Sequence, residues 1–177
     1  MADDLRDYLA HETLLDGRPV VIRAIRRDDK DALVQGLRRL SERSVYNRFF
    51  APKQRLSAAE LEYLTELDFV SHVALLAVVP TDGGDRAVGV GRFIVVDPEV
   101  GSAEVALTVD DEHQGLGIGT RLLAHLAAIG RGLELTEFRA AVLGSNRQMF
   151  DVFERSGLRV ERTVSRGEAT VRLALGP

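Results

Sequence analysis

The clearest pattern of hydrophobic and polar residues lies in the middle of the chain. Val105, Leu107 and Val109 alternate with polar or small residues, which predicts a β-strand with two different faces over 103–109. After a polar, glycine-rich stretch, apolar residues recur every three or four positions, which is typical of an amphipathic helix. The pattern therefore predicts a strand, a loop and then a helix that begins near Ile118.

The other segments predict a mixed sheet covered by helices on both faces. Short turns join three successive strands that end with 103–109, so these should be antiparallel. The helix from Ile118 crosses to a strand at 137–143, and a crossover of that length makes the two strands parallel. Residues 1–18 are expected to be a frayed or loosely docked lead-in. The predicted strands are 19–25, 72–79, 87–96, 103–109, 137–143, 158–164 and 169–175, and the other predicted helices are 29–39, 41–50, 57–67 and 146–157.

These elements define an α/β (α+β) fold with a mostly antiparallel central sheet of about seven strands. The 177 residues, of which 45% are hydrophobic and 28% charged, predict one globular domain over 1–177 with its core at about 19–175. A net charge of −4 argues against nucleic acid as a partner. No apolar run has the length of a membrane span and the first residues do not resemble a signal peptide, so no membrane partner and a cytoplasmic location are expected.

Metal and disulfide chemistry are not expected either. The chain contains no cysteine, which excludes disulfides, cysteine nucleophiles and cysteine metal ligands. Histidines and carboxylates do not occur at the spacing of metal ligands, so we predict no metal site.

The glycines at the start of the central helix carry the candidate chemistry. Gly115, Gly117 and Gly119 would let backbone N–H groups approach a ligand, and the helix N-terminus adds partial positive charge. This arrangement predicts an anion cradle, above all for phosphate. A dinucleotide-binding loop would need Gly or Ala at Thr120, and an NTPase loop would need a lysine that is absent. A glycine-rich turn without any ligand is the plainer alternative.

The segment resembles the acetyl-CoA pyrophosphate loop of the GNAT N-acetyltransferases. Their pattern Q/R-x-x-G-x-G/A is met by Gln114, Gly117 and Gly119, between a strand ending in V-D and a helix continuing R-L-L. The order of predicted elements over 19–175 is also that of the family. The resemblance implies a GNAT fold, in which strand 103–109 splays from its parallel neighbour and acetyl-CoA, the co-substrate, lies in the wedge.

The resemblance also implies which residues bind this cofactor. The backbone at the end of the strand pairs with the pantetheine arm, and the loop amides bind the pyrophosphate. Asn146 opens the last helix, where an Asn contacts the cofactor arm in many members; a simple N-cap is the alternative. Phe153 stands where many members have a tyrosine that protonates the thiolate, so that donor is absent and Phe153 is either core or a wall of the cleft. The implied cofactor-binding residues are Leu107, Thr108, Val109, Gln114, Gly115, Leu116, Gly117, Ile118, Gly119, Thr120, Asn146 and Phe153.

Glu104 is the candidate general base. An amine acceptor is protonated at neutral pH and must lose a proton before it can attack a thioester. Glu104 lies on the strand face of Thr108, roughly 13 Å up-strand at about 3.3 Å per residue, where the thioester of an arm anchored at the loop would end. A solvated surface carboxylate is the alternative reading, and Glu112 is the second candidate base.

The stretch S-x-Y-x-R-F-F at 44–50 is similar to the acetyltransferase domain of bacterial protein-lysine acetyltransferases. Its plainer interpretation is the end of an amphipathic helix. Three hypotheses follow: an N-acetyltransferase acting on a protein lysine, the same chemistry on a small amine, and a non-catalytic acyl-CoA-binding module. Family members are often dimers, so a homodimer is one candidate assembly.

Overall fold

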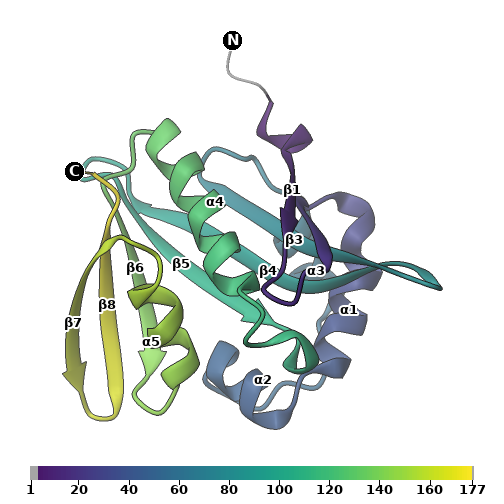
Figure 1. The fold of residues 1–177 in the computed structure, drawn as a ribbon. Helices are drawn as coiled ribbons and strands as arrows, with labels where there is room; N and C mark the ends of the chain where they lie inside the picture. Colours follow the sequence, from purple (N-terminus) through teal and green to yellow (C-terminus); the bar gives the residue numbers. More distant parts are fainter. Residues whose placement is uncertain (1–3, 177) are drawn as a thin grey trace.

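An eight-stranded sheet with helices on both faces organises residues 4–176, the part of the chain that the computed structural model describes (Figure 1). The strand order is β1-β2-β3-β4-β5-β6-β8-β7, and every neighbouring pair is antiparallel except β5 and β6. The predicted mixed α/β fold with a mostly antiparallel sheet is confirmed. The strands are β1 (Leu9–Thr13), β2 (Pro19–Ala24), β3 (His72–Thr81), β4 (Gly84–Asp97), β5 (Ser102–Val109), β6 (Glu137–Leu143), β7 (Arg159–Ser165) and β8 (Glu168–Ala174).

The helices follow the predicted boundaries to within a few residues. Ser57 and Glu60 form the capping box that begins α3, and Ser41 caps α2 through its hydroxyl oxygen. The α-helices are α1 (Lys30–Arg39), α2 (Glu42–Phe49), α3 (Ala58–Thr65), α4 (Ile118–Gly132) and α5 (Arg147–Glu154), and the 3₁₀ turns are η1 (Leu5–Asp7), η2 (Arg27–Asp29) and η3 (Asp111–His113).

The two faces of the sheet carry different helices. Helix α4 lies across one face, while α1 and α3 lie on the opposite side of β3 and β4 (Figure 1). Two glycines of β4 let α4 approach closely: a Cβ at Gly91 would lie 2.8 Å from the Leu107 side chain and 3.0 Å from that of Leu126. The main hydrophobic core is therefore the layer between α4 and the sheet, where Leu122 and Leu126 are fully buried.

The expectation of a frayed or loosely docked lead-in was wrong. Residues 9–13 form β1, which pairs along its whole length with β2 and raises the strand count from about seven to eight. The Tyr8 hydroxyl lies 2.5 Å from His125 Nδ1 of α4, and His125 Nε2 lies 3.0 Å from the Glu12 carboxylate. Leu14 is buried in the core. The alternation in β1 is short and mostly polar, so its pairing depends on contacts with distant residues that local periodicity does not reveal.

The parallel pair β5 and β6 separates after only a few residues. Its ladder contains three pairs, of which Glu104 with Arg139 is the last. Strand β6 continues to Leu143 beside β8, and β5 continues to Val109 beside β4. The two strands therefore diverge beyond Glu104, and this fork is the splay that the family resemblance implied.

Candidate functional site

The loop before α4 presents a row of unused backbone donors. Among the described residues, the amides of 115–120 donate no hydrogen bond, whereas the next amide, of Arg121, donates to the Gly117 carbonyl. Gly115 and Gly117 have φ angles of +77° and +85°, the left-handed region that favours glycine. Free amides in consecutive turns at the start of a 15-residue helix form a site suited to a phosphate or diphosphate.

Gly119 has a second role, in packing. A Cβ there would lie 3.1 Å from a methyl group of Val152, so the glycine allows α4 and α5 to approach each other. The backbone of Gly119 also lines the cavity described next. Its residue type therefore reflects packing between helices as well as access to the loop amides.

A cavity of about 330 Å³ extends from this loop along the end of β5 that β6 no longer pairs, and α5 lies on its other side. It brings together residues of the β5 end, the glycine loop and α5, which the sequence placed in one cofactor site. Of the predicted cofactor-binding residues, Leu107, Thr108, Val109, Gln114, Gly115, Gly117, Ile118, Gly119, Thr120 and Asn146 line it.

Leu116 and Phe153 do not line the cavity. The Leu116 carbonyl accepts a hydrogen bond from the Leu15 amide, which ties the loop to the N-terminal segment. Phe153 is 2% exposed and belongs to the hydrophobic core. It is therefore a core residue and does not form a wall of the cavity. Its aromatic ring turns inward because it is on the buried face of α5, beside Phe150.

Asn146 caps α5 and also faces the cavity. Its Oδ1 accepts a hydrogen bond from the Met149 amide at 3.2 Å, which caps α5, and its buried side chain also lines the cavity. The cap fixes the side-chain oxygen, so the amide nitrogen is the group left for other partners.

The loop is held by contacts from α2 that sequence reasoning missed. Asp111 accepts hydrogen bonds from the hydroxyls of Ser41 and Ser44, each at 2.8 Å. Gln114 donates to the Val109 carbonyl at 3.1 Å and to the Ser44 hydroxyl at 3.4 Å. Partial burial is the largest single influence on the pKa of Asp111 and raises it, but the hydrogen bonds from Ser41 and Ser44 together outweigh burial, so the pKa is lowered. The carboxylate therefore points to α2 and away from the anion cradle.

Glu104 lies at the apex of the fork. It is exposed, it is the last β5 residue paired with β6, and it does not line the cavity itself. The neighbouring charge is Arg48 of α2: burial lowers the pKa of that guanidinium, and the negative charge of Glu104 opposes the lowering. Glu112, the second candidate base, is 75% exposed in its side chain and pairs with Arg86 at 3.3 Å, outside the cavity.

Arg92 on β4 is a further functional candidate that the sequence did not single out. It is 4% exposed, and Nη1 lies 3.0 Å from His72 Nε2 and 3.4 Å from the Leu64 carbonyl. Burial, and then the positive charge of Arg48, lowers the pKa of Arg92 to about 9. His72 is neutral, because burial and the Arg92 charge lower its pKa to about 4. The sequence did not identify Arg92 because an arginine in an alternating strand usually lies on the exposed face, and only the fold brings His72 and the Leu64 carbonyl to it.

Membrane-spanning helices and metal-binding clusters are both absent from residues 4–176. No helix there is long and apolar enough to cross a membrane. Within the same residues, no three histidine or carboxylate side chains are grouped as metal ligands would be.

Comparison with known proteins identifies the class. The family model described as "Acetyltransferase (GNAT) family" matches residues 40–158, about two thirds of the chain, so the chain belongs to the GNAT acetyltransferases. The predicted family and N-acetyltransferase class are confirmed.

The individual relatives agree with this class. An acetyltransferase of Pseudomonas aeruginosa is 34% identical over 141 residues, which cover 80% of this chain and 75% of that protein. The crystal structure of the GNAT domain of S. lividans PAT superposes with a TM-score of 0.84 at 35% identity, covering 94% of this chain and 96% of that one. The acetyltransferase Pat of Mycolicibacterium smegmatis is 31% identical over 77% of this chain, which spans 40% of that protein.

Proposed function

We propose that the protein transfers an acetyl group from acetyl-CoA directly to a primary amine, the side chain of a protein lysine, with Glu104 as general base. The observation that carries the proposal is the row of free amides at 115–120, at the mouth of a fork whose apex is Glu104. The likeness to the S. lividans PAT domain over nearly the whole chain supports a protein acceptor.

The residues of the cavity fit acetyl-CoA. The amides of 115–120 would hold its diphosphate, and the edge of β5 at 107–109, which β6 no longer pairs, would pair with the pantetheine arm. When bound, acetyl-CoA supplies the activated acetyl thioester. Asn146 and Met149 form the opposite wall of the cavity, from α5.

Glu104 would take the proton of the acceptor ammonium group, directly or through a water molecule, so that the nitrogen lone pair becomes free to attack. Its exposure suits this role, because a protein acceptor must approach from solvent. Phe153 carries no hydroxyl and is buried in the core, so protonation of the leaving thiolate falls to water or to another group.

The variant Glu104→Gln tests the base. It keeps the size and hydrogen-bonding shape of the side chain but cannot accept the proton, so kcat should fall by about 10²–10⁴-fold while the Kd for CoA stays unchanged. Glu112→Gln, on the exposed side of η3, is the matched control and should retain wild-type turnover. Wild-type kcat in the Glu104→Gln variant would show that the base lies elsewhere.

The acceptor is tested by incubating the protein and labelled acetyl-CoA with cell-lysate proteins and, separately, with a panel of polyamines and amino acids. Label in lysine side chains of proteins is the expected result. Label in small amines alone would rule out the protein acceptor, and tight CoA binding with no transfer to either would make the chain a binding module.

A further inference from the structure

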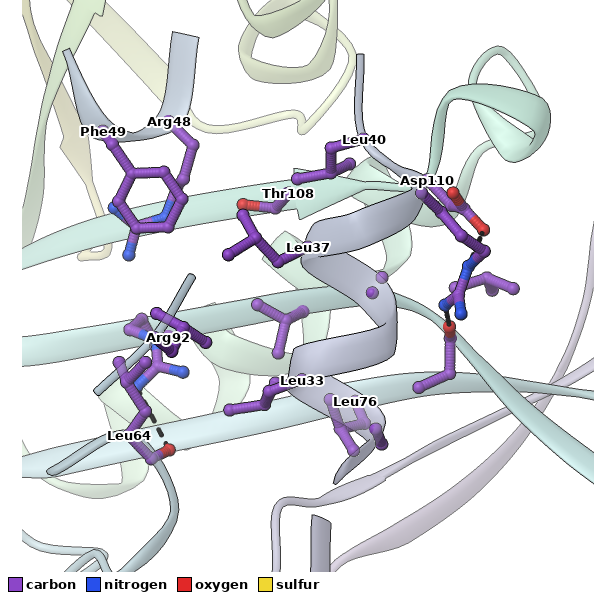
Figure 2. A pocket seen from close by; sticks show the side chains of 18 residues that line it. Leu33, Leu37, Leu40, Arg48, Phe49, Leu64, Leu76, Arg92, Thr108 and Asp110 are labelled. Atoms are coloured by element: carbon purple, nitrogen blue, oxygen red, sulfur yellow. Dashed lines mark hydrogen bonds and ion pairs between the residues drawn. The ribbon is translucent and has the colours of Figure 1, made fainter. Parts of the chain in front are cut away.

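A second pocket lies on the other side of β5, between α1 and the sheet (Figure 2). It offers about 100 Å³ of free space, and aliphatic side chains such as Leu33, Leu37 and Leu76 form most of its wall. Its polar groups gather at two ends: Figure 2 shows Arg48 and Arg92 at one end and Asp110 at the other. The two ends differ in how well their charges are matched.

Asp110 is paired with two arginines through one of its oxygens. Its Oδ2 accepts hydrogen bonds from Arg39 Nε at 3.0 Å and from Arg86 Nη2 at 2.9 Å, while the buried Oδ1 has no hydrogen-bond partner among the described residues. The negative charge at this end of the pocket is therefore balanced by two guanidinium groups that are already in place.

Arg92 has donors that nothing satisfies. Both of its hydrogen-bond contacts use Nη1, and its buried Nε has no partner among the described residues. Nε and Nη2 are the two nitrogens that form the side-on fork of a guanidinium, which matches the two oxygens of a carboxylate. Leaving a buried donor such as this Nε unpaired is costly, so its availability indicates a missing acceptor.

Arg48 adds a second positive charge at the same end. Its guanidinium lies over the Phe49 ring, with Cζ 5.1 Å from the centroid, and no carboxylate in residues 4–176 comes within 4.0 Å of it. The hydroxyl of Thr108, also on the pocket wall, is buried without a hydrogen-bond partner. Two guanidinium groups without an ion pair in the described part of the chain and a free hydroxyl therefore line the same end of the pocket, and Glu104 is the negative charge that acts on Arg48 without pairing with it.

We propose that this pocket binds a carboxylate carried by the amine acceptor, with Arg92 as its bidentate partner and Arg48 as the second cation. The aliphatic wall packs against the short carbon chain that carries the carboxylate. The free space suits an acidic side chain or a small amino acid and excludes a nucleotide.

The pocket lies next to the proposed site of acetyl transfer. The assignment of its ligand to the amine acceptor rests on the proposed function. In the β4–β5 ladder Arg92 pairs with Ala106 and Ile94 pairs with Glu104, so Arg92 and Glu104 share one face of the sheet, two positions apart. Arg48 and Thr108 line this pocket and also the cofactor cavity. A carboxylate on Arg92 would thus place the amine of the same acceptor near Glu104.

The first experiment measures binding alone and needs no transfer. Isovalerate should raise the melting temperature of the wild-type protein in a saturable way, and its uncharged analogue isovaleramide should not. The shift should disappear in Arg92→Lys, which keeps the charge but loses the pair of parallel N–H donors. It should also disappear in Arg48→Gln, which should fold normally because the half-buried Arg48 side chain makes no ion pair with another described residue. Equal effects of acid and amide on wild-type protein, or an undiminished shift in a folded Arg48→Gln variant, would overturn the site.

The second experiment measures selectivity with lysine peptides that differ only in a Glu or Gln next to the lysine, and with lysine against cadaverine. The acidic acceptors should have kcat/KM at least about tenfold higher, the effect of one charged hydrogen bond, and Arg92→Lys should abolish the difference. Isovalerate binding without any selectivity would mean that a free acid fills the pocket and would refute an acceptor-borne carboxylate. Absence of transfer to every amine would refute the proposed function instead, while the melting experiment would still report on the pocket.

Discussion

Gly115 is the residue at which the anion cradle can be tested with the least damage to the fold. A Cβ there would meet no atom within 4 Å, and Asn and Asp tolerate its left-handed φ better than other residues. Gly115→Asp would place a carboxylate among the free amides, so the affinity for CoA should fall by at least about tenfold through charge repulsion. Calorimetric titration with CoA measures this.

The matched control is Gly115→Asn, which has the same shape without the charge and should bind CoA far more tightly than the Asp variant. Identical affinities for the two variants would show that the diphosphate does not lie against this loop. Gly119 is unsuitable for the same test because its replacement would push on Val152 of α5.

Single residues also show what the sequence could and could not predict. Glycine spacing ahead of an amphipathic helix has a local physical cause, so Gln114, Gly117 and their neighbours could be assigned to one site. Arg92 and Asp111 could not, because their roles come from partners such as His72 and Ser41 that only the fold brings near. The partner of Asp111 is 70 positions away in the chain.

At the scale of elements, the main error concerned β1, the first strand of the sheet. Five short, largely polar residues carry little strand signal, yet their backbone pairs fully with β2. The elements from β2 to β8 were predictable because their apolar runs, turns and caps are local. The docking of β1 depends on Tyr8 and Glu12 meeting His125, which lies on α4.

The Tyr8 contact allows a measurement of how strongly β1 is held. Tyr8→Phe removes the hydroxyl that lies 2.5 Å from His125 Nδ1 and should lower the free energy of unfolding by about 1 kcal/mol. Urea denaturation checks this. Tyr63→Phe is the control: its ring is 58% exposed and should change stability by less than about 0.5 kcal/mol. Equal effects would mean that the Tyr8 hydrogen bond contributes nothing to docking.

For the whole molecule, the buried His72 predicts how stability depends on pH. Its pKa in the folded protein is about 4, against 6.5 for a histidine in an unfolded chain, because burial and the charge of Arg92 disfavour protonation. Between pH 6.5 and 4, His72 is protonated in the unfolded chain but stays neutral in the folded protein. Stability is therefore complete above pH 6.5 and decreases as the pH falls toward 4, by about 3 kcal/mol in total from this group.

Replacing the imidazole isolates this contribution. His72→Gln keeps a hydrogen-bond acceptor for Arg92 without a titrating ring, so its free energy of unfolding should decrease less steeply between pH 6.5 and 4 than that of the wild type. His11→Gln, at an exposed position of β1, should retain the wild-type slope. Parallel curves for wild type and His72→Gln would show that His72 is not kept neutral by the fold.

The three-pair ladder between β5 and β6 has a consequence for the order of events during turnover. It is the only strand-to-strand junction, within residues 4–176, between the sheet portion β1–β5 and the portion β6–β8. The molecule thus has a seam, which is bridged by this ladder, by α4 and by the packing of Phe93 on Phe138. In the proposed complex the pantetheine arm would lie along the seam as an added strand and complete the surface beside Glu104. We therefore expect a compulsory sequence, in which acetyl-CoA enters first and the acceptor second.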